Sequence, residues 1–111
     1  MISTHVLDTV AGTPAAGVRI TIERLLGGVW NVLGEVTTDT DGRVKEVLPE
    51  DAPREAGSYR LTFETGLYFA SCGITAFHPR AAVEFEVRDA GAHHHVPLLL
   101  GPYSYTTYRG S

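Results

Sequence analysis

The chain has one cysteine, one methionine and one tryptophan in 111 residues, and it has no long hydrophobic run. Cys72 has no second cysteine with which to form an internal disulfide, which is typical of a reducing compartment. The strongly apolar segment 96–100 is far shorter than the roughly 20 residues that a membrane-spanning helix needs. We therefore expect neither a disulfide scaffold nor a membrane partner.

Positive charge is also scarce. Nine lysine and arginine residues against 13 aspartate and glutamate residues give a formal net charge of −4 at pH 7. The basic residues are dispersed along the chain rather than gathered into a stripe, which disfavours a nucleic-acid partner. The first residues lack the basic start and apolar stretch of a secretory signal, so we expect a cytoplasmic protein.

The composition is otherwise that of a globular protein, with 43% hydrophobic and 20% charged residues and no low-complexity tract. A chain of this length typically forms one hydrophobic core, so we predict a single domain over residues 1–111. A lone thiol outside any reactive motif is usually a small buried hydrophobe, and we expect Cys72 to be one.

Alternation of apolar and polar residues dominates the chain. The segments 18–23, 59–64 and 83–88 show it clearly, as strands with one buried face require. Weaker candidate strands lie at 5–7, 29–38, 43–48, 93–100 and 103–108. Turn-forming residues separate these segments, among them the string Asp39-Thr40-Asp41-Gly42, which is read as a turn rather than a calcium loop. The pattern predicts an antiparallel β-sandwich or barrel.

Two segments depart from simple alternation. Residues 67–74 place their apolar side chains at helical spacing, which predicts one short helix. The three consecutive leucines at 98–100 put apolar side chains on both faces of one predicted strand. A sandwich with a solvated outer face would alternate there, so we expect a subunit interface.

Histidines are the main candidates for chemistry. His93 and His95 share one face of a predicted strand, and His94 points to the other. Two imidazoles on one face suit acid–base work or a metal ion, because the pKa of histidine lies near 6.5. A zinc site needs a third or fourth ligand, which the local sequence does not supply. Simple solvation of three histidines on an edge strand is the alternative.

Three further groups carry useful polar side chains. For His5, early in a predicted strand, a structural or solvent-facing position is the alternative to a functional one. Arg43 follows the Asp41-Gly42 turn, where its guanidinium suits a planar anionic ligand or a surface ion pair. The ending Tyr108-Arg109-Gly110-Ser111 indicates an ordered tail with polar groups at a site. No glycine-rich phosphate loop or nucleophile elbow is present.

Five strings along the chain carry a resemblance to a known family. They are Ser3-Thr4-His5-Val6-Leu7-Asp8, Asp41-Gly42-Arg43, Phe77-His78-Pro79, His93-His94-His95-Val96-Pro97-Leu98-Leu99-Leu100 and Tyr108-Arg109-Gly110-Ser111. Together they resemble the 5-hydroxyisourate hydrolases of the transthyretin-related family over essentially the whole chain. The ending is the most specific string, because hormone-carrying transthyretins share the fold but lack it.

The resemblance implies an all-β, transthyretin-like sandwich of two four-stranded antiparallel sheets with one short helix, assembled as a homotetramer with its sites between dimers. It implies hydrolysis of the small molecule 5-hydroxyisourate to 2-oxo-4-hydroxy-4-carboxy-5-ureidoimidazoline in urate breakdown, without cofactor or metal. The residues that match the family's pocket are His5, Arg43, His95, Tyr108 and Ser111, and His93 is the other histidine of its motif.

The resemblance also implies a mechanism. One of His5 and His95 takes a proton from the attacking water while the other protonates the departing ring nitrogen, and the sequence leaves their assignment open. Arg43 steadies the developing negative charge, and Tyr108 and Ser111 orient the substrate. The alternative function is a transthyretin-like carrier, which binds a small aromatic ligand in the channel between dimers without converting it.

Overall fold

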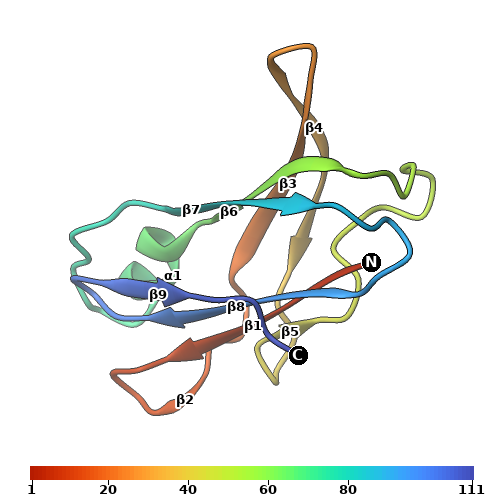
Figure 1. Cartoon of the computed structure of the whole chain (residues 1–111). Coiled ribbons are helices and arrows are strands. Elements are labelled where there is room, and N and C mark those ends of the chain that lie inside the picture. Colours follow the sequence, from red (N-terminus) through yellow and green to blue (C-terminus); the bar gives the residue numbers. More distant parts are fainter.

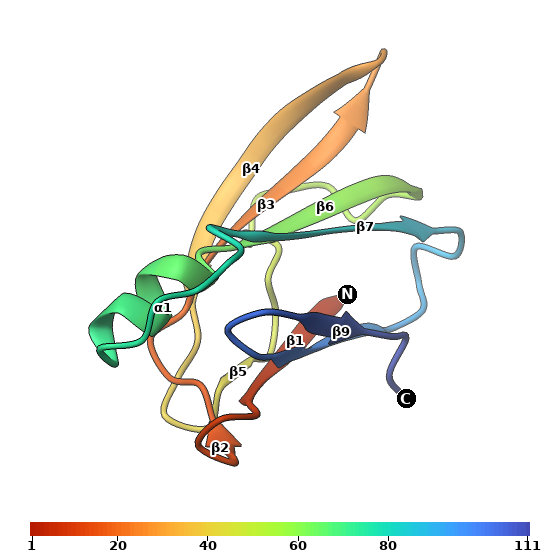
Figure 2. The same ribbon diagram turned by 90° about the vertical axis from the view of Figure 1, so that its left-hand side faces the viewer.

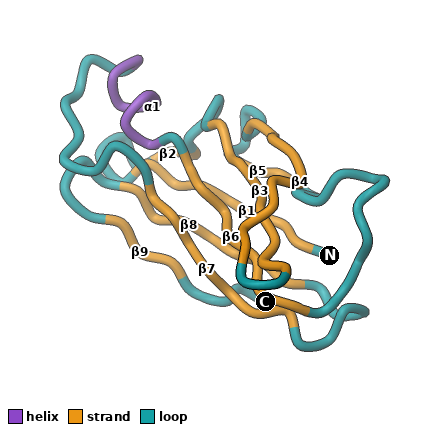
Figure 3. Tube along the Cα trace, turned by 90° about the horizontal axis from the view of Figure 1, so that it is seen from above, coloured by secondary structure: helices purple, strands orange, loops and turns teal.

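The computed structural model describes residues 1–111 as two facing sheets and one short helix (Figure 1). The first sheet contains β1 (Ile2–Asp8), β2 (Thr13–Pro14), β5 (Arg43–Val44), β8 (His94–Leu100) and β9 (Tyr105–Thr107). The second contains β3 (Arg19–Leu26), β4 (Val29–Thr37), β6 (Gly57–Phe63) and β7 (Ala81–Val87). The helix α1 (Thr65–Ser71) lies at one end of the sandwich (Figure 3). The predicted β-sandwich with one short helix is confirmed.

Strand order and direction decide which residues become neighbours. The order is β2-β1-β8-β9 in the first sheet, with β5 paired to β1, and β4-β3-β6-β7 in the second. Every pair is antiparallel except β1 and β8, which run parallel. A parallel pair needs a long crossover, and the whole second sheet lies between β1 and β8 in the sequence. The first sheet is therefore mixed and has five strands, where the resemblance implied four antiparallel ones. Alternation along single strands does not reveal this difference.

The alternating pattern buries one face of each sheet in a shared core. Ile20 and Ile22 of β3 and Leu61 of β6 are fully buried, as are Val6 of β1 and Leu98 of β8. Fully burying an aliphatic side chain of this size contributes roughly 1.5–3 kcal/mol. The period-two pattern therefore supplies the contacts that hold the two sheets together and leaves the alternate side chains on the outer faces.

Three local features differ from the predictions. Cys72 is exposed rather than buried, because α1 ends at Ser71 and Cys72 caps the helix with its N–H bonded to the carbonyl of Phe69. The strand expected over 43–48 ends at Val44, since the consecutive residues Val47 and Leu48 are both buried and do not alternate. The helix occupies Thr65–Ser71 rather than 67–74. With seven residues, α1 is too short to span a bilayer.

Candidate functional site

The outer face of the first sheet brings together polar side chains from both ends of the chain. The β1–β8 register places Ser3 opposite His95, and the β1–β5 register places His5 opposite Arg43. Ser3 and His5 are two residues apart on one strand and point to the same face. Side chains opposite one another on neighbouring strands have Cβ atoms about 5 Å apart. These four residues therefore form one continuous polar row.

A pocket of about 370 Å³ opens on this face. Its lining residues are Ser3, Thr4, Arg43, Val44, Lys45, His93, His95 and Ser111, of which one is hydrophobic. Four residues predicted from the sequence, Arg43, His93, His95 and Ser111, thus meet at one place. His5 does not line the pocket but stands beside Arg43 in the sheet. Such a lining suits a small polar or anionic ligand.

A tight turn presents Arg43 to the pocket. The N–H groups of Asp41 and Arg43 donate to Oδ1 of Asp39 over 2.8 and 2.9 Å. The bond from Arg43 is the main reason that the pKa of Asp39 lies below its usual value. Gly42 has φ of +70°, and a Cβ there would lie 2.5 Å from the carbonyl oxygen of Val6. The predicted turn is confirmed, and glycine is required in it for conformation and space.

Ser3 links the two histidines that share this face. Its Oγ lies 2.7 Å from Nε2 of His93 and 2.8 Å from Nδ1 of His95. His94 is buried on the opposite face, as predicted, with its Nδ1 3.1 Å from the carbonyl oxygen of Ala92. Ser3 is not among the residues predicted from the sequence, although its position two residues before His5 could have indicated it. No three His, Cys, Asp or Glu side chains gather in a metal-ligating group.

Burial and neighbouring charges act on His95. Burial is the main cause that lowers the pKa of His95 below its usual value, and the charges of Arg43, His5 and His93 lower it further. Arg43 and Lys45 take part in no ion pair, whereas six other arginines do. The charge of these two side chains therefore acts on the pocket. Burial and neighbouring cations keep the imidazole neutral, so an unprotonated ring nitrogen is available to accept a proton.

The last residues of the chain return to β8 and contact His95. Gly110 donates its N–H to the carbonyl oxygen of His95 over 2.8 Å, which forms an antiparallel bridge. A Cβ on Gly110 would lie 2.4 Å from Cδ2 of His95 and 3.1 Å from Cγ of Pro97. Only glycine lets the backbone lie this close to the ring. The tail is thereby ordered, and Ser111 reaches the pocket.

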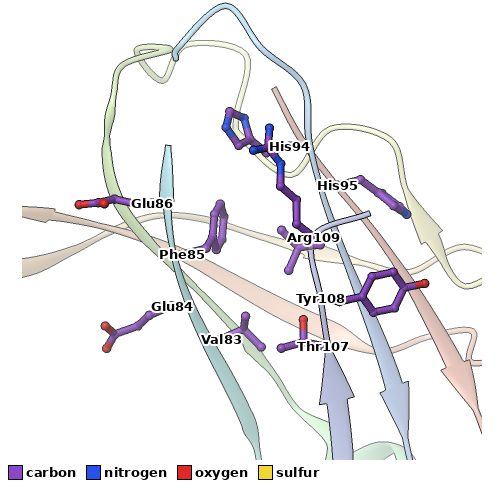
Figure 4. A pocket seen from close by; sticks show the side chains of 10 residues that line it. Val83, Glu84, Phe85, Glu86, His94, His95, Thr107, Tyr108 and Arg109 are labelled. Atoms are coloured by element: carbon purple, nitrogen blue, oxygen red, sulfur yellow. The ribbon is translucent and has the colours of Figure 1, made fainter. Parts of the chain in front are cut away.

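Tyr108 lies on another side of His95, in a second pocket of about 250 Å³. Residues of β7, β8, β9 and the tail line it, among them Phe85, His94 and Arg109. Figure 4 shows the rings of His95 and Tyr108 both pointing away from β7. Of the site residues predicted from the sequence, only His95 lines both pockets. The structure thus places Tyr108 next to the predicted site without making it part of the same pocket.

Similar proteins are found by sequence and by structure. The HIUase/Transthyretin family model matches residues 2–110. The 5-hydroxyisourate hydrolase 2 of Rhizobium meliloti is 46% identical over 114 residues, covering 99% of this chain and 95% of that protein. The solved 5-hydroxyisourate hydrolase of Klebsiella pneumoniae is 40% identical with a TM-score of 0.83, covering 99% and 98%. Sea bream transthyretin, solved in complex with thyroxine, is 35% identical with a TM-score of 0.89, covering 98% and 93%.

Proposed function

This chain belongs to the HIUase/Transthyretin family, and we propose that it hydrolyses 5-hydroxyisourate in the pocket formed by β1, β5, β8 and the tail. Residues 1–111 act as one hydrolase domain, whose product is 2-oxo-4-hydroxy-4-carboxy-5-ureidoimidazoline. The observation that carries the proposal is the pair of His95, whose pKa is lowered, and Arg43, which has no carboxylate partner, in one polar pocket. The named 5-hydroxyisourate hydrolases that match almost the full chain support it.

His95 acts as the general base. Its lowered pKa keeps the imidazole neutral at pH 7, and its ring borders the pocket. The neutral ring takes a proton from a water molecule while the water oxygen attacks the ring carbonyl carbon of the substrate. A positioned general base typically contributes about 10²–10⁴-fold to the rate, so His95 supplies a large part of the acceleration.

Arg43 and His5 serve the rest of the reaction. The carbonyl oxygen gains negative charge as water adds, and the unpaired guanidinium of Arg43 stabilises that charge. The ring carbon–nitrogen bond then breaks, and His5, which stands opposite Arg43 in the sheet, supplies the proton that the leaving nitrogen needs. The carbon keeps the hydroxyl oxygen and becomes the carboxylate of the product as the acid's proton passes to solvent. The proton that His95 took from water replaces, by exchange, the one that His5 gave. No step in this scheme requires a metal or a cofactor.

The remaining predicted residues bind and orient the substrate. His93 and Ser111 line the pocket with His95 and offer hydrogen bonds to the substrate's ring carbonyl and N–H groups. Tyr108 is 55% exposed, and its ring projects to the same side as His95. We place its hydroxyl at the edge of the bound substrate. Binding holds the substrate in the reactive orientation, so the entropy of orienting it is lost on binding rather than in the chemical step, and the barrier to reaction is lower.

A coupled ultraviolet assay tests the hydrolase proposal. A uricase generates 5-hydroxyisourate from urate, and the decay of its absorbance is followed with and without this protein. The expected result is decay faster than the spontaneous rate and unchanged by a chelator. Folded protein that produces no acceleration would reject the proposal, and activity lost with chelator and restored by metal would reject the metal-free mechanism.

The alternative is a carrier that binds an aromatic ligand without converting it. The sea bream relative was solved with thyroxine bound. Here seven of the eight pocket residues are not hydrophobic, and a largely apolar ligand would remove water from Arg43 and Lys45 without replacing its hydrogen bonds. Calorimetry with thyroxine distinguishes the two functions, because tight binding without turnover is expected only of a carrier.

Assembly into a homotetramer, a dimer of dimers, would enclose the pocket. Leu7 and Leu99 are paired in register on the outer face of the first sheet, and both are partly exposed. The strands β7 and β9 are sheet edges on the same side of the molecule (Figure 2), where their free backbone groups can pair with a second copy. We propose that edge pairing forms dimers, that the leucine face joins two of them, and that the tetramer is cytoplasmic.

Light scattering tests the assembly. The expected mass is four times the 12.0 kDa of one chain. A charged residue at the leucine face, Leu99→Arg, should leave dimers, because the partly exposed side chain has room to turn outward within one protomer but would be buried between dimers. A wild-type monomer, or a variant that stays tetrameric, would contradict this arrangement.

A further inference from the structure

The hydroxyl of Ser3 stands between two histidine rings at hydrogen-bond distance from both. It is 2.7 Å from Nε2 of His93 and 2.8 Å from Nδ1 of His95. Ser3 is only 8% exposed, so bulk water has little access to the bridge. The three residues come from chain segments about ninety positions apart, and the parallel β1–β8 register brings them together.

A hydroxyl carries one proton, and this limits the protonation of the two rings. Ser3 can donate to one ring nitrogen only, so the other nitrogen must itself carry a hydrogen and donate to the serine oxygen. When both rings are neutral, two arrangements satisfy both bonds. In one, Nδ1 of His95 donates to Ser3 and Ser3 donates to His93. In the other, Nε2 of His93 donates to Ser3 and Ser3 donates to Nδ1 of His95.

The charges in the pocket select between these arrangements. When Nδ1 of His95 carries the proton, its Nε2 has a free lone pair, and this nitrogen makes no hydrogen bond within the chain. The pocket that His95 borders also contains the unpaired cations Arg43 and Lys45. Positive charge in the same pocket favours the tautomer whose Nε2 carries a lone pair over the tautomer whose Nε2 carries a hydrogen. The first arrangement is therefore favoured.

We propose that Ser3 is a positioning residue that sets the tautomer of His95, accepting its Nδ1–H and donating to Nε2 of His93, so that the free Nε2 of His95 serves as the base. This inference rests on the proposed hydrolase function for its catalytic consequence. Neutral histidine in water prefers the opposite tautomer, with the proton on Nε2, which would leave no base facing the substrate. The hydrogen-bond partner of one ring nitrogen commonly sets the state of the other.

The contact with Gly110 makes this ring orientation unusually well defined. The bridge to Ser3 holds the Nδ1 edge of His95, and the backbone at Gly110 packs against Cδ2. The ring is thus held on two edges by segments from opposite ends of the chain. A ring flip would exchange Nδ1 with Cδ2, which loses the bond to Ser3, so its orientation and its tautomer are set together.

Nitrogen-15 NMR of the histidine rings tests the tautomer without substrate. At a pH where His95 is neutral, the wild-type protein should show a protonated Nδ1 and an unprotonated Nε2 on His95. Ser3→Ala should shift the signals toward the Nε2–H form, while Ser3→Thr, which keeps the hydroxyl, should retain the wild-type pattern. A wild-type spectrum with the proton on Nε2 would overturn the proposal, and this result does not depend on how Ser3→Ala folds.

Kinetics tests the catalytic consequence. Ser3→Ala is expected to lower kcat by about a hundredfold with KM nearly unchanged, and Ser3→Thr to restore most of the rate. Ser58→Ala, the same exchange on β6 of the other sheet, is the matched control and should keep the wild-type rate. Full kcat in Ser3→Ala would overturn the role of Ser3. Wild-type protein without any activity would instead reject the hydrolase function, while the NMR result would stand by itself.

Discussion

The outer faces of the two sheets handle positive charge in opposite ways. On the second sheet, Arg60 donates to both carboxylate oxygens of Glu23 over 2.9 and 3.1 Å, and its guanidinium carbon lies 4.3 Å from the centre of the Trp30 ring. At the first sheet, Arg43 of β5 and Lys45, just after that strand, have no carboxylate within ion-pair distance and share a pocket with two histidines. The outer face of the second sheet thus has a paired cation, whereas the first sheet has unpaired ones.

The difference indicates which face is built for stability and which for a ligand. A cation that is paired and stacked on its own sheet reinforces the pairing of neighbouring strands. An unpaired cation adds little to stability, but it lowers the pKa of a neighbouring histidine and attracts an anion. The arrangement of charge therefore points to the first sheet as the functional face, independently of any similarity to other proteins.

Replacing His95, His5 or Arg43 on the first sheet by alanine should cause the largest loss of activity. His95→Ala is expected to lower kcat by about 10³-fold, because it removes the proposed general base, and His5→Ala and Arg43→Ala should also abolish most turnover. All three side chains lie on the outer face, so circular dichroism and light scattering should report an unchanged fold and assembly. If all three variants keep full activity in the ultraviolet assay, the assigned site is wrong.

A single methyl group at the tail should cause the next largest loss. Gly110→Ala places a Cβ 2.4 Å from Cδ2 of His95, so the ring must move away from the position that Ser3 holds. A misplacement of about 1 Å at a reacting group can cost about a hundredfold in rate, and we expect a loss of that size in kcat. Gly91→Ala, where the nearest atom is 3.4 Å away, is the control and should be neutral. Equal activity of both variants would contradict the contact.

The pH dependence should reveal the unpaired charge of Arg43. Activity that needs neutral His95 falls as the pH drops through its lowered pKa. Arg43→Gln removes one of the charges that lower this pKa, so the pKa should rise toward its usual value and the acid limb of kcat/KM should move to higher pH. Profiles of the residual activity from about pH 5 to pH 8 measure the shift. A limb that stays in place or moves to lower pH would show that Arg43 does not act on His95.

Replacing one cation on each face by glutamine should give the smallest effects, and each effect should be confined to one property. Lys45→Gln is expected to raise KM several-fold and to weaken the dependence of kcat/KM on salt, with stability unchanged. Arg60→Gln should leave kinetics unchanged and lower the free energy of unfolding by about 1 kcal/mol, because it breaks a partly buried pair with Glu23. Chemical denaturation and kinetics of both variants check the comparison. A kinetic defect in Arg60→Gln would remove the distinction between the faces.

The sequence by itself determined the sandwich, most of its strands and buried positions, and the opposite orientations of His94 and its neighbours. Alternation along one strand is a local property, because successive side chains point to opposite faces whatever the strand pairs with. The Asp41-Gly42 turn that presents Arg43 is equally local. The motif strings also identified Arg43, His93, His95 and Ser111, which the structure brings into one pocket.

Only the tertiary structure decided which residues meet. The register between strands far apart in the chain follows from the packing of the whole core and leaves no local pattern. The parallel pairing that places Ser3 opposite His95 could therefore not be predicted from either segment alone. For the same reason, the sequence did not reveal Lys45 in the pocket, the contact of Gly110 with His95, or the position of Tyr108 beside it. The lowered pKa of His95 follows from burial and from the charges gathered around it, both of which exist only in the folded chain.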